Sequence, residues 1–167
     1  MLISLHSPYI EPGDLKGNLN THKDLINKFD SNLHVFPELS ITGYNCGDLF
    51  FNSHYLAEAT KNIKVIHEFC KKKNKIAIVG VPFEFKGSLF NCAAVLGLSK
   101  IIYKAKVELC TAQEYYEDRW FKSGISLNEH AELNSSASEF EISNPLIPLS
   151  LVINDKLISI GIEICED

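Results

Sequence analysis

The stretch Lys75-Ile76-Ala77-Ile78-Val79-Gly80 predicts a strand, because it is short, apolar and rich in β-branched residues. Its run Ile76–Val79 is apolar without interruption, which is typical of a strand in a sheet that is covered on both faces. Two short apolar stretches earlier in the chain, Leu2–His6 and Leu33–Phe36, also predict strands, and Pro37 stops the second of them. These three stretches predict a sheet at the centre of the fold.

Two amphipathic helices are expected between these strands. Ser53 is a candidate cap for the second helix. The apolar positions of the first helix fall at helical spacing on one face: Leu19, His22, Ile26 and Phe29. Those of the second form one stripe with steps of three and four: Leu56, Ala59, Ile63, Ile66 and Cys70. The order strand-helix-strand-helix-strand therefore predicts an α/β fold.

The rest of the chain is expected to be mostly strands. They are predicted at Leu89–Leu96, Ile101–Lys104, Ser138–Ile142 and Leu157–Ile164. The polar stretch Asn128–Ser136 is expected to be an exposed loop. Because the last strand is strongly apolar and the chain stops at Asp167, we expect further chain beyond this residue to cover the strand.

Composition places the chain among single-domain globular proteins. It has 167 residues, of which 46% are hydrophobic and 22% charged, close to the usual proportions. A net charge of −5 provides no attraction to nucleic acid or to an anionic membrane. No apolar stretch approaches the length of a spanning helix, and no basic flank marks a signal peptide. The five cysteines are odd in number and form no CxxC pair, which favours reduced thiols in a cytoplasmic protein.

Three places in the sequence are candidates for chemistry. Glu38 follows an apolar strand, where it serves either as a general base or as an ordinary turn carboxylate. Cys165 follows the last strand and is either a nucleophile or a small core residue. Lys104 and Lys106 either present one ammonium to a pocket and the other to solvent, or are both solvated at the end of a strand. The six histidines form no HxxxH or HxH pair, so no metal site is expected.

Taken together and in this order, Glu38, Lys106 and Cys165 resemble the Glu-Lys-Cys triad of the nitrilase (carbon–nitrogen hydrolase) superfamily. Longer blocks of sequence resemble one branch of it, the glutamine-dependent NAD(+) synthetases. These blocks are Gly13–Asn18, Val35–Tyr44 with Asp48-Leu49, Leu89–Leu96, Tyr115–Phe121 and Gly161–Asp167. The resemblance extends over almost the whole chain.

This resemblance implies a fold, a domain and a reaction. The implied fold is an α-β-β-α sandwich, of which this chain holds the N-terminal part. Residues 1–167 would form a glutaminase (carbon–nitrogen hydrolase) domain that ends just after its nucleophile, with the synthetase domain absent from this chain. The implied reaction hydrolyses glutamine and supplies ammonia for the ATP-dependent amidation of deamido-NAD. No cofactor is implied in this segment, ATP and Mg²⁺ belong to the absent synthetase domain, and the protein is expected to form a homo-oligomer.

The resemblance also implies a role for each site residue. Glu38 would act as the base, Cys165 as the nucleophile and Lys106 as the cation that stabilises the oxyanion. The backbone N–H of Glu166, which follows the nucleophile, would also contact the oxyanion or substrate.

Other nitrilase-like sites hold a second glutamate near the lysine. Glu114 is the preferred candidate for it here, Glu117 is the alternative, and both could instead be ordinary surface carboxylates. One departure from the family lies close by. This chain has Leu109-Cys110-Thr111-Ala112 where members usually carry Leu-Pro-Asn-Tyr or Leu-Pro-Thr-Tyr, with a tyrosine that helps to hold glutamine.

Two other interpretations remain open at this point. The chain could be a free-standing amidohydrolase of another nitrilase branch, although the block Glu117-Asp118-Arg119-Trp120-Phe121 favours the synthetase branch. It could also be a catalytically inactive domain that acts only in assembly, because exposed apolar sheet surface promotes association.

Overall fold

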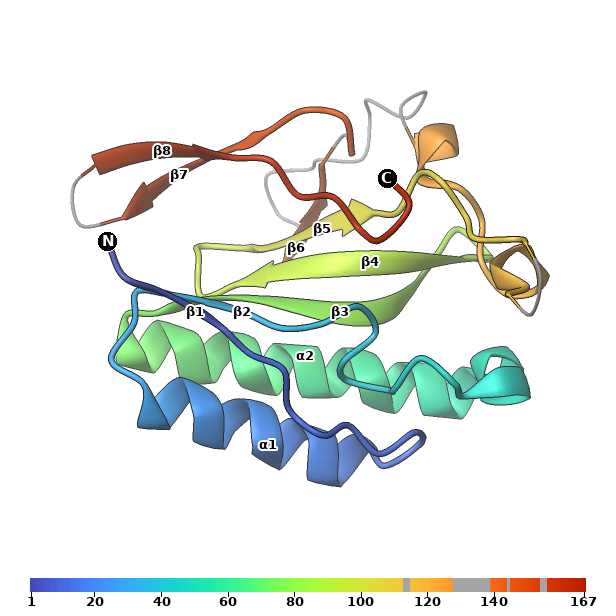
Figure 1. The fold of residues 1–167 in the computed structure, drawn as a ribbon, viewed down its shortest axis with the longest axis horizontal. Coiled ribbons are helices and arrows are strands. Elements are labelled where there is room, and N and C mark those ends of the chain that lie inside the picture. Colours follow the sequence, from blue (N-terminus) through green and yellow to red (C-terminus); the bar gives the residue numbers. More distant parts are fainter. Residues whose placement is uncertain (113–114, 128–138, 144, 154–155) are drawn as a thin grey trace.

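A six-stranded mixed sheet forms the centre of the fold, with its strands in the order β1-β2-β3-β4-β5-β6 (Figure 1). The structure is a computed structural model that describes residues 1–112, 115–127, 139–143, 145–153 and 156–167. β1, β2 and β3 run parallel, β3–β4 and β4–β5 are antiparallel pairs, and β6 is parallel to β5. The elements are β1 (Ile3–Leu5), α1 (Leu15–Lys28), β2 (Leu33–Val35), the 3-10 helix η1 (Gly47–Phe51), α2 (Ser53–Lys73), β3 (Ile76–Phe85), β4 (Ser88–Leu96), β5 (Ile101–Ala105), the 3-10 helices η2 (Glu117–Arg119) and η3 (Gly124–Leu127), β6 (Phe140–Ile142), β7 (Leu149–Ile153) and β8 (Lys156–Ile160).

Both helices cover one face of this sheet (Figure 1). The whole predicted stripe of α2 is buried, and Ile63, Ile66 and Cys70 are fully enclosed against β3 and β4. The cap lies one residue earlier than expected. The side chain of Asn52, not that of Ser53, accepts a hydrogen bond from a backbone N–H of the first turn. None of the helices among the described residues is long and apolar enough to cross a membrane.

The β7–β8 hairpin covers the opposite face (Figure 1). Exposure alternates along β7, because Leu149, Leu151 and Ile153 point at the sheet while the residues between them face outward. These three side chains pack with Ile78 of β3 and Val95 of β4. The described residues thus supply the first helix layer and parts of both sheet layers of the expected α-β-β-α sandwich.

The last strand of the structure ends at Ile160, earlier than the predicted strand Leu157–Ile164. β8 stops at Ile160, which pairs with Leu149, the first residue of β7. Because β7 begins at Leu149, the ladder ends at this pair, and residues 161–164 leave the hairpin and run across the main sheet (Figure 1). This detour carries Cys165 towards the ends of β2 and β5.

Two strands differ from what the sequence predicts. β7 was not expected from the sequence at all, and β3 continues five residues beyond Gly80 as one arm of a long hairpin with β4. The predicted loop Asn128–Ser136 lies outside the described residues, as does Ser138 of the expected strand Ser138–Ile142.

Candidate active site

Glu38 lies just beyond the carboxyl end of β2, where the chain turns sharply. Leu39 has a φ of +49°, in the left-handed region, and the N–H of Ile41 donates to the carbonyl of Gly80 on β3. Only a glycine at position 80 lets the backbone of this turn lie so close to β3. A Cβ at position 80 would lie 2.2 Å from the backbone nitrogen of Leu39 and 2.5 Å from the carbonyl oxygen of Pro37.

We expect Gly80→Ala to lower both the turnover of this candidate active site and folding stability. The added methyl group meets backbone atoms, which cannot rotate away, so the turn that carries Glu38 must shift. A shift of about 1 Å in a reacting group can cost about a hundredfold in rate. Steady-state kinetics and urea unfolding of the variant test this. Gly87→Ala is a control for turnover alone, because its methyl group meets nothing within 4 Å while its φ of +76° strains any side chain there. Wild-type kinetics in Gly80→Ala would contradict it.

Lys106 follows β5 directly and points into the interior. Its backbone is fixed on both sides, since its N–H donates to the carbonyl of Asn91 and its own carbonyl accepts from the N–H of Gly124. The side chain is fully buried, and its Nζ lies 3.0 Å from Oε1 of Glu38 and 2.9 Å from Oε2 of Glu117. Burial alone would lower the pKa of Lys106, but its hydrogen bonds to the two carboxylates raise this pKa above the ordinary value. The ammonium is therefore charged.

Glu117 holds the other side of this ammonium. It is the first residue of η2, is only 2% exposed, and has a partner for each oxygen besides Lys106. Tyr44 Oη donates to Oε1 and the N–H of Cys110 donates to Oε2, both at 2.8 Å. Burial and this hydrogen bond raise the pKa of Tyr44, so its hydroxyl stays a neutral donor. The structure thus places Glu117 beside Lys106, whereas Glu114, the glutamate preferred from the sequence, lies outside the described residues.

Asn91 was not singled out from the sequence. It lies on β4, is buried, and its Nδ2 donates to Oε1 of Glu38 at 2.7 Å. The same carboxylate oxygen therefore accepts from both Asn91 and Lys106. A polar residue in the middle of the apolar run Leu89–Leu96 is the signal that could have drawn attention to it.

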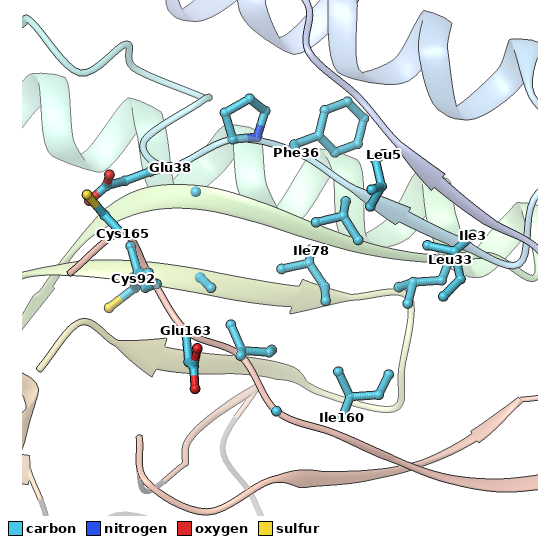
Figure 2. A pocket seen from close by; sticks show the side chains of 17 residues that line it. Ile3, Leu5, Leu33, Phe36, Glu38, Ile78, Cys92, Ile160, Glu163 and Cys165 are labelled. Carbon is cyan, nitrogen blue, oxygen red and sulfur yellow. The ribbon is translucent and has the colours of Figure 1, made fainter. Parts of the chain in front are cut away.

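Cys165 lies in a tight turn that begins at the buried Ile164. Its φ is +55°, in the left-handed region that a non-glycine residue rarely adopts, and such strain is common at functional positions. In Figure 2 its sulfur points towards the carboxylate of Glu38. Partial burial raises the pKa of the thiol, the Lys106 ammonium lowers it, and Glu38, Glu166 and Glu117 raise it again. The net result is a raised pKa, so the thiol needs a base to become a nucleophile.

A cavity of about 360 Å³ opens beside these two side chains (Figure 2). Glu38 and Cys165 both line it, while most of its wall is apolar and comes from β1, β2, β3 and residues 160–164. Glu166, expected to present its N–H to an oxyanion, lies on the exposed side of the turn, with its carboxylate 3.8 Å from the sulfur of Cys110.

The expectation that one lysine of the pair faces solvent is wrong. Lys104 is only 2% exposed, and its Nζ donates to the carbonyl of Ile147. Residues two apart on a strand share a face, and here the β7–β8 side of β5 is covered. Only Lys106, just past the end of β5, reaches the two carboxylates.

Together these groups are suited to act as a nucleophile, a base and an oxyanion-stabilising cation. The Cys165 thiol faces the Glu38 carboxylate. The Lys106 ammonium lies between this carboxylate and the buried carboxylate of Glu117. This set suits attack on a carbonyl carbon, because the base can take the thiol proton and the ammonium can stabilise the negative oxygen. Within the described part of the chain, no three His, Cys, Asp or Glu side chains gather as a metal site.

Comparisons with known proteins give the chain a family and a set of relatives. A family model described as carbon–nitrogen hydrolase matches residues 4–167. The chain is 32% identical over 127 residues to the glutamine-dependent NAD(+) synthetase of Aquifex aeolicus, covering 71% of this chain and 22% of that protein. It is 31% identical over 117 residues to the enzyme of the same name from Dictyostelium discoideum, covering 67% of this chain and 16% of that protein. It thus spans less than a quarter of the length of these relatives.

Two solved structures resemble the fold. One is a glutamine-dependent NAD(+) synthetase from Cytophaga hutchinsonii, with a TM-score of 0.64 and 21% identity over 95% of this chain and 24% of that one. The other is an amidase from Nesterenkonia sp., with a TM-score of 0.66 and 15% identity over 95% of this chain and 54% of that one. At these identities the likeness concerns the fold alone.

Proposed function

Because the chain belongs to the carbon–nitrogen hydrolase family, we propose that it is the glutamine-hydrolysing part of a glutamine-dependent NAD(+) synthetase. The observation that carries this proposal is the buried Lys106 ammonium, held between Glu38 and Glu117 beside the Cys165 thiol. Support for the synthetase branch comes from the names of the curated relatives.

In the proposed mechanism the reaction starts when Glu38 takes the proton of the Cys165 thiol. Glu38 is suited to this because its Oε1 already accepts hydrogen bonds from Lys106 and Asn91, which hold the carboxylate in place. The thiolate attacks the side-chain amide carbon of glutamine and forms a C–S bond. The former carbonyl oxygen becomes negative and is stabilised by the Lys106 ammonium and by the N–H of Glu166.

Collapse of this tetrahedral intermediate breaks the C–N bond. Glu38 returns its proton to the leaving nitrogen, so ammonia departs and a glutamyl thioester remains on Cys165. Glu38 then takes a proton from water, and the water oxygen attacks the thioester carbon. The C–S bond breaks, glutamate leaves, and Glu38 returns the proton to the sulfur of Cys165, which restores the thiol. Glu117 serves throughout by keeping Lys106 charged and oriented.

We further propose that the ammonia serves a C-terminal synthetase domain of the complete, homo-oligomeric protein. That domain would use ATP and Mg²⁺ to activate deamido-NAD for amidation. No step of glutamine hydrolysis passes through these two groups, so the two half-reactions can be measured separately.

A substrate comparison tests this function. Glutamate and ammonia release should be measured with glutamine and, in parallel, with butyramide, a simple aliphatic amide. We expect kcat/KM for glutamine to be higher by about a hundredfold or more, since polar recognition of a substrate discriminates strongly. A preference for butyramide would favour a free-standing amidohydrolase, and turnover of neither would favour a catalytically inactive domain that acts in assembly.

A further inference from the structure

The side chain of Asp167 makes three hydrogen bonds to the backbone of the site. Its Oδ1 accepts from the N–H of Val107 and from the N–H of Glu108, both at 2.8 Å. Its Oδ2 accepts from the N–H of Ile164 at 3.1 Å, and its own N–H donates to the Ile164 carbonyl at 3.3 Å. One carboxylate thus closes the turn around Cys165 and joins it to a distant segment.

That distant segment begins right after Lys106 and is itself rigidly held. The carbonyl of Val107 accepts from the hydroxyl of Ser123 at 2.6 Å, and the carbonyl of Lys106 accepts from the N–H of Gly124 at 2.7 Å. On the other side, Lys106 donates its N–H to β4 at 2.8 Å. Asp167 therefore links the Cys165 turn to the rigid backbone of Val107 and Glu108, which directly follows the lysine that carries the ammonium.

We infer that Asp167 is a positioning residue, whose carboxylate sets the place of the Cys165 turn relative to Lys106. For its effect on turnover this inference rests on the proposed function. The strained backbone of Cys165 gives the reason for such a residue. A left-handed φ at a non-glycine residue persists only where surrounding contacts enforce it, and here one carboxylate supplies hydrogen bonds on both sides of the turn. The same contacts orient the N–H of Glu166, which lies between Cys165 and Asp167.

The test uses the reactivity of the thiol itself. Alkylation of Cys165 by iodoacetamide should be followed against pH in the purified protein, from the modified Cys165 peptide by mass spectrometry. Asp167→Ala removes all three acceptor contacts. Asp167→Asn keeps one carbonyl oxygen for the two N–H groups of Val107 and Glu108. Asp24→Asn, on an exposed position of α1, is the matched control that removes the same charge elsewhere.

In Asp167→Ala the turn is released, so the exposed thiol is no longer held at a fixed place relative to the charges of Lys106 and Glu38. We expect the pH midpoint of alkylation to shift by about half a pH unit or more from that of wild type. Asp167→Asn should lie between this variant and wild type, and Asp24→Asn should match wild type. With glutamine, kcat of Asp167→Ala should fall by about tenfold to a hundredfold while KM stays similar.

An alkylation midpoint in Asp167→Ala that equals that of wild type would overturn the inference. So would an Asp167→Asn protein as strongly affected as Asp167→Ala, because partial retention of the contacts must give partial rescue. If the alanine variant does not fold, the asparagine variant is the test, and its alkylation midpoint must differ from that of Asp24→Asn. If wild type hydrolyses no glutamine, the proposed function fails while the alkylation profile still tests Asp167.

Discussion

Replacing Cys165 by alanine is expected to abolish glutamine-dependent NAD formation and to leave ammonia-dependent NAD formation largely intact. Without the thiol no thioester can form, and neither Glu38 nor Lys106 can replace it as the attacking group. A synthetase domain supplied with free ammonia needs no glutaminase. NAD formation by the complete protein should therefore be measured with glutamine and with an ammonium salt in parallel.

Cys70→Ala is the matched control for this experiment. Cys70 is fully buried in the α2 stripe, where burial raises the pKa of its thiol to about 12, so it is inert as a nucleophile. Its variant should keep the wild-type ratio of the two activities even if it is less stable. Glutamate release that persists in Cys165→Ala would remove this cysteine from the mechanism.

The helical layer could be predicted from the sequence because its signal is long and local. Five apolar positions at steps of three and four along α2 leave one face to bury, and all five are buried. The apolar runs that predict the first three strands are short, but they alternate with these helices, and this order favours an α/β sheet. The end of β2 at Val35, two residues before Pro37, follows from local chemistry too, and it places Glu38 just beyond the carboxyl end of this strand.

The second layer depends on contacts that are distant in sequence. The end of β8 is set by the start of its partner β7 after Pro148, which the apolar run Leu157–Ile164 does not reveal. The burial of Lys104 has the same origin. Its expected solvent exposure would require an open face on β5, but the β7–β8 hairpin covers that face.

Within the site, the sequence named the residues whose types are chemically distinctive. The structure places Glu38, Lys106 and Cys165 together, although long stretches of chain separate them. Their supporting residues were harder to predict. The contact of Glu117 with Lys106 depends on where η2 lies relative to the end of β5, and the contact of Asn91 with Glu38 depends on the position of β4 beside β3.

Lys106→Met is expected to lower kcat/KM for glutamine by about a hundredfold or more, the usual cost of losing one oxyanion donor. The change also leaves the carboxylates of Glu38 and Glu117 without the ammonium between them. Because Glu117 is buried, we expect folding stability to fall by about 3 kcal/mol or more, as when one partner of a buried ion pair is removed. Glutaminase kinetics and urea unfolding should both be measured, at a temperature where the variant is folded.

Two other variants separate the loss of chemistry from the loss of stability. Lys104→Met removes a buried ammonium two residues away that contacts the carbonyl of Ile147 rather than the site carboxylates, so it should lose stability but keep glutaminase activity near wild type. Glu38→Gln keeps the shape of the base but cannot take a proton, and should lose about a hundredfold or more in turnover. If Lys104→Met lost the activity and Lys106→Met kept it, the oxyanion role would belong to the other lysine, and the mechanism built on the Glu38–Lys106–Glu117 contacts would fail.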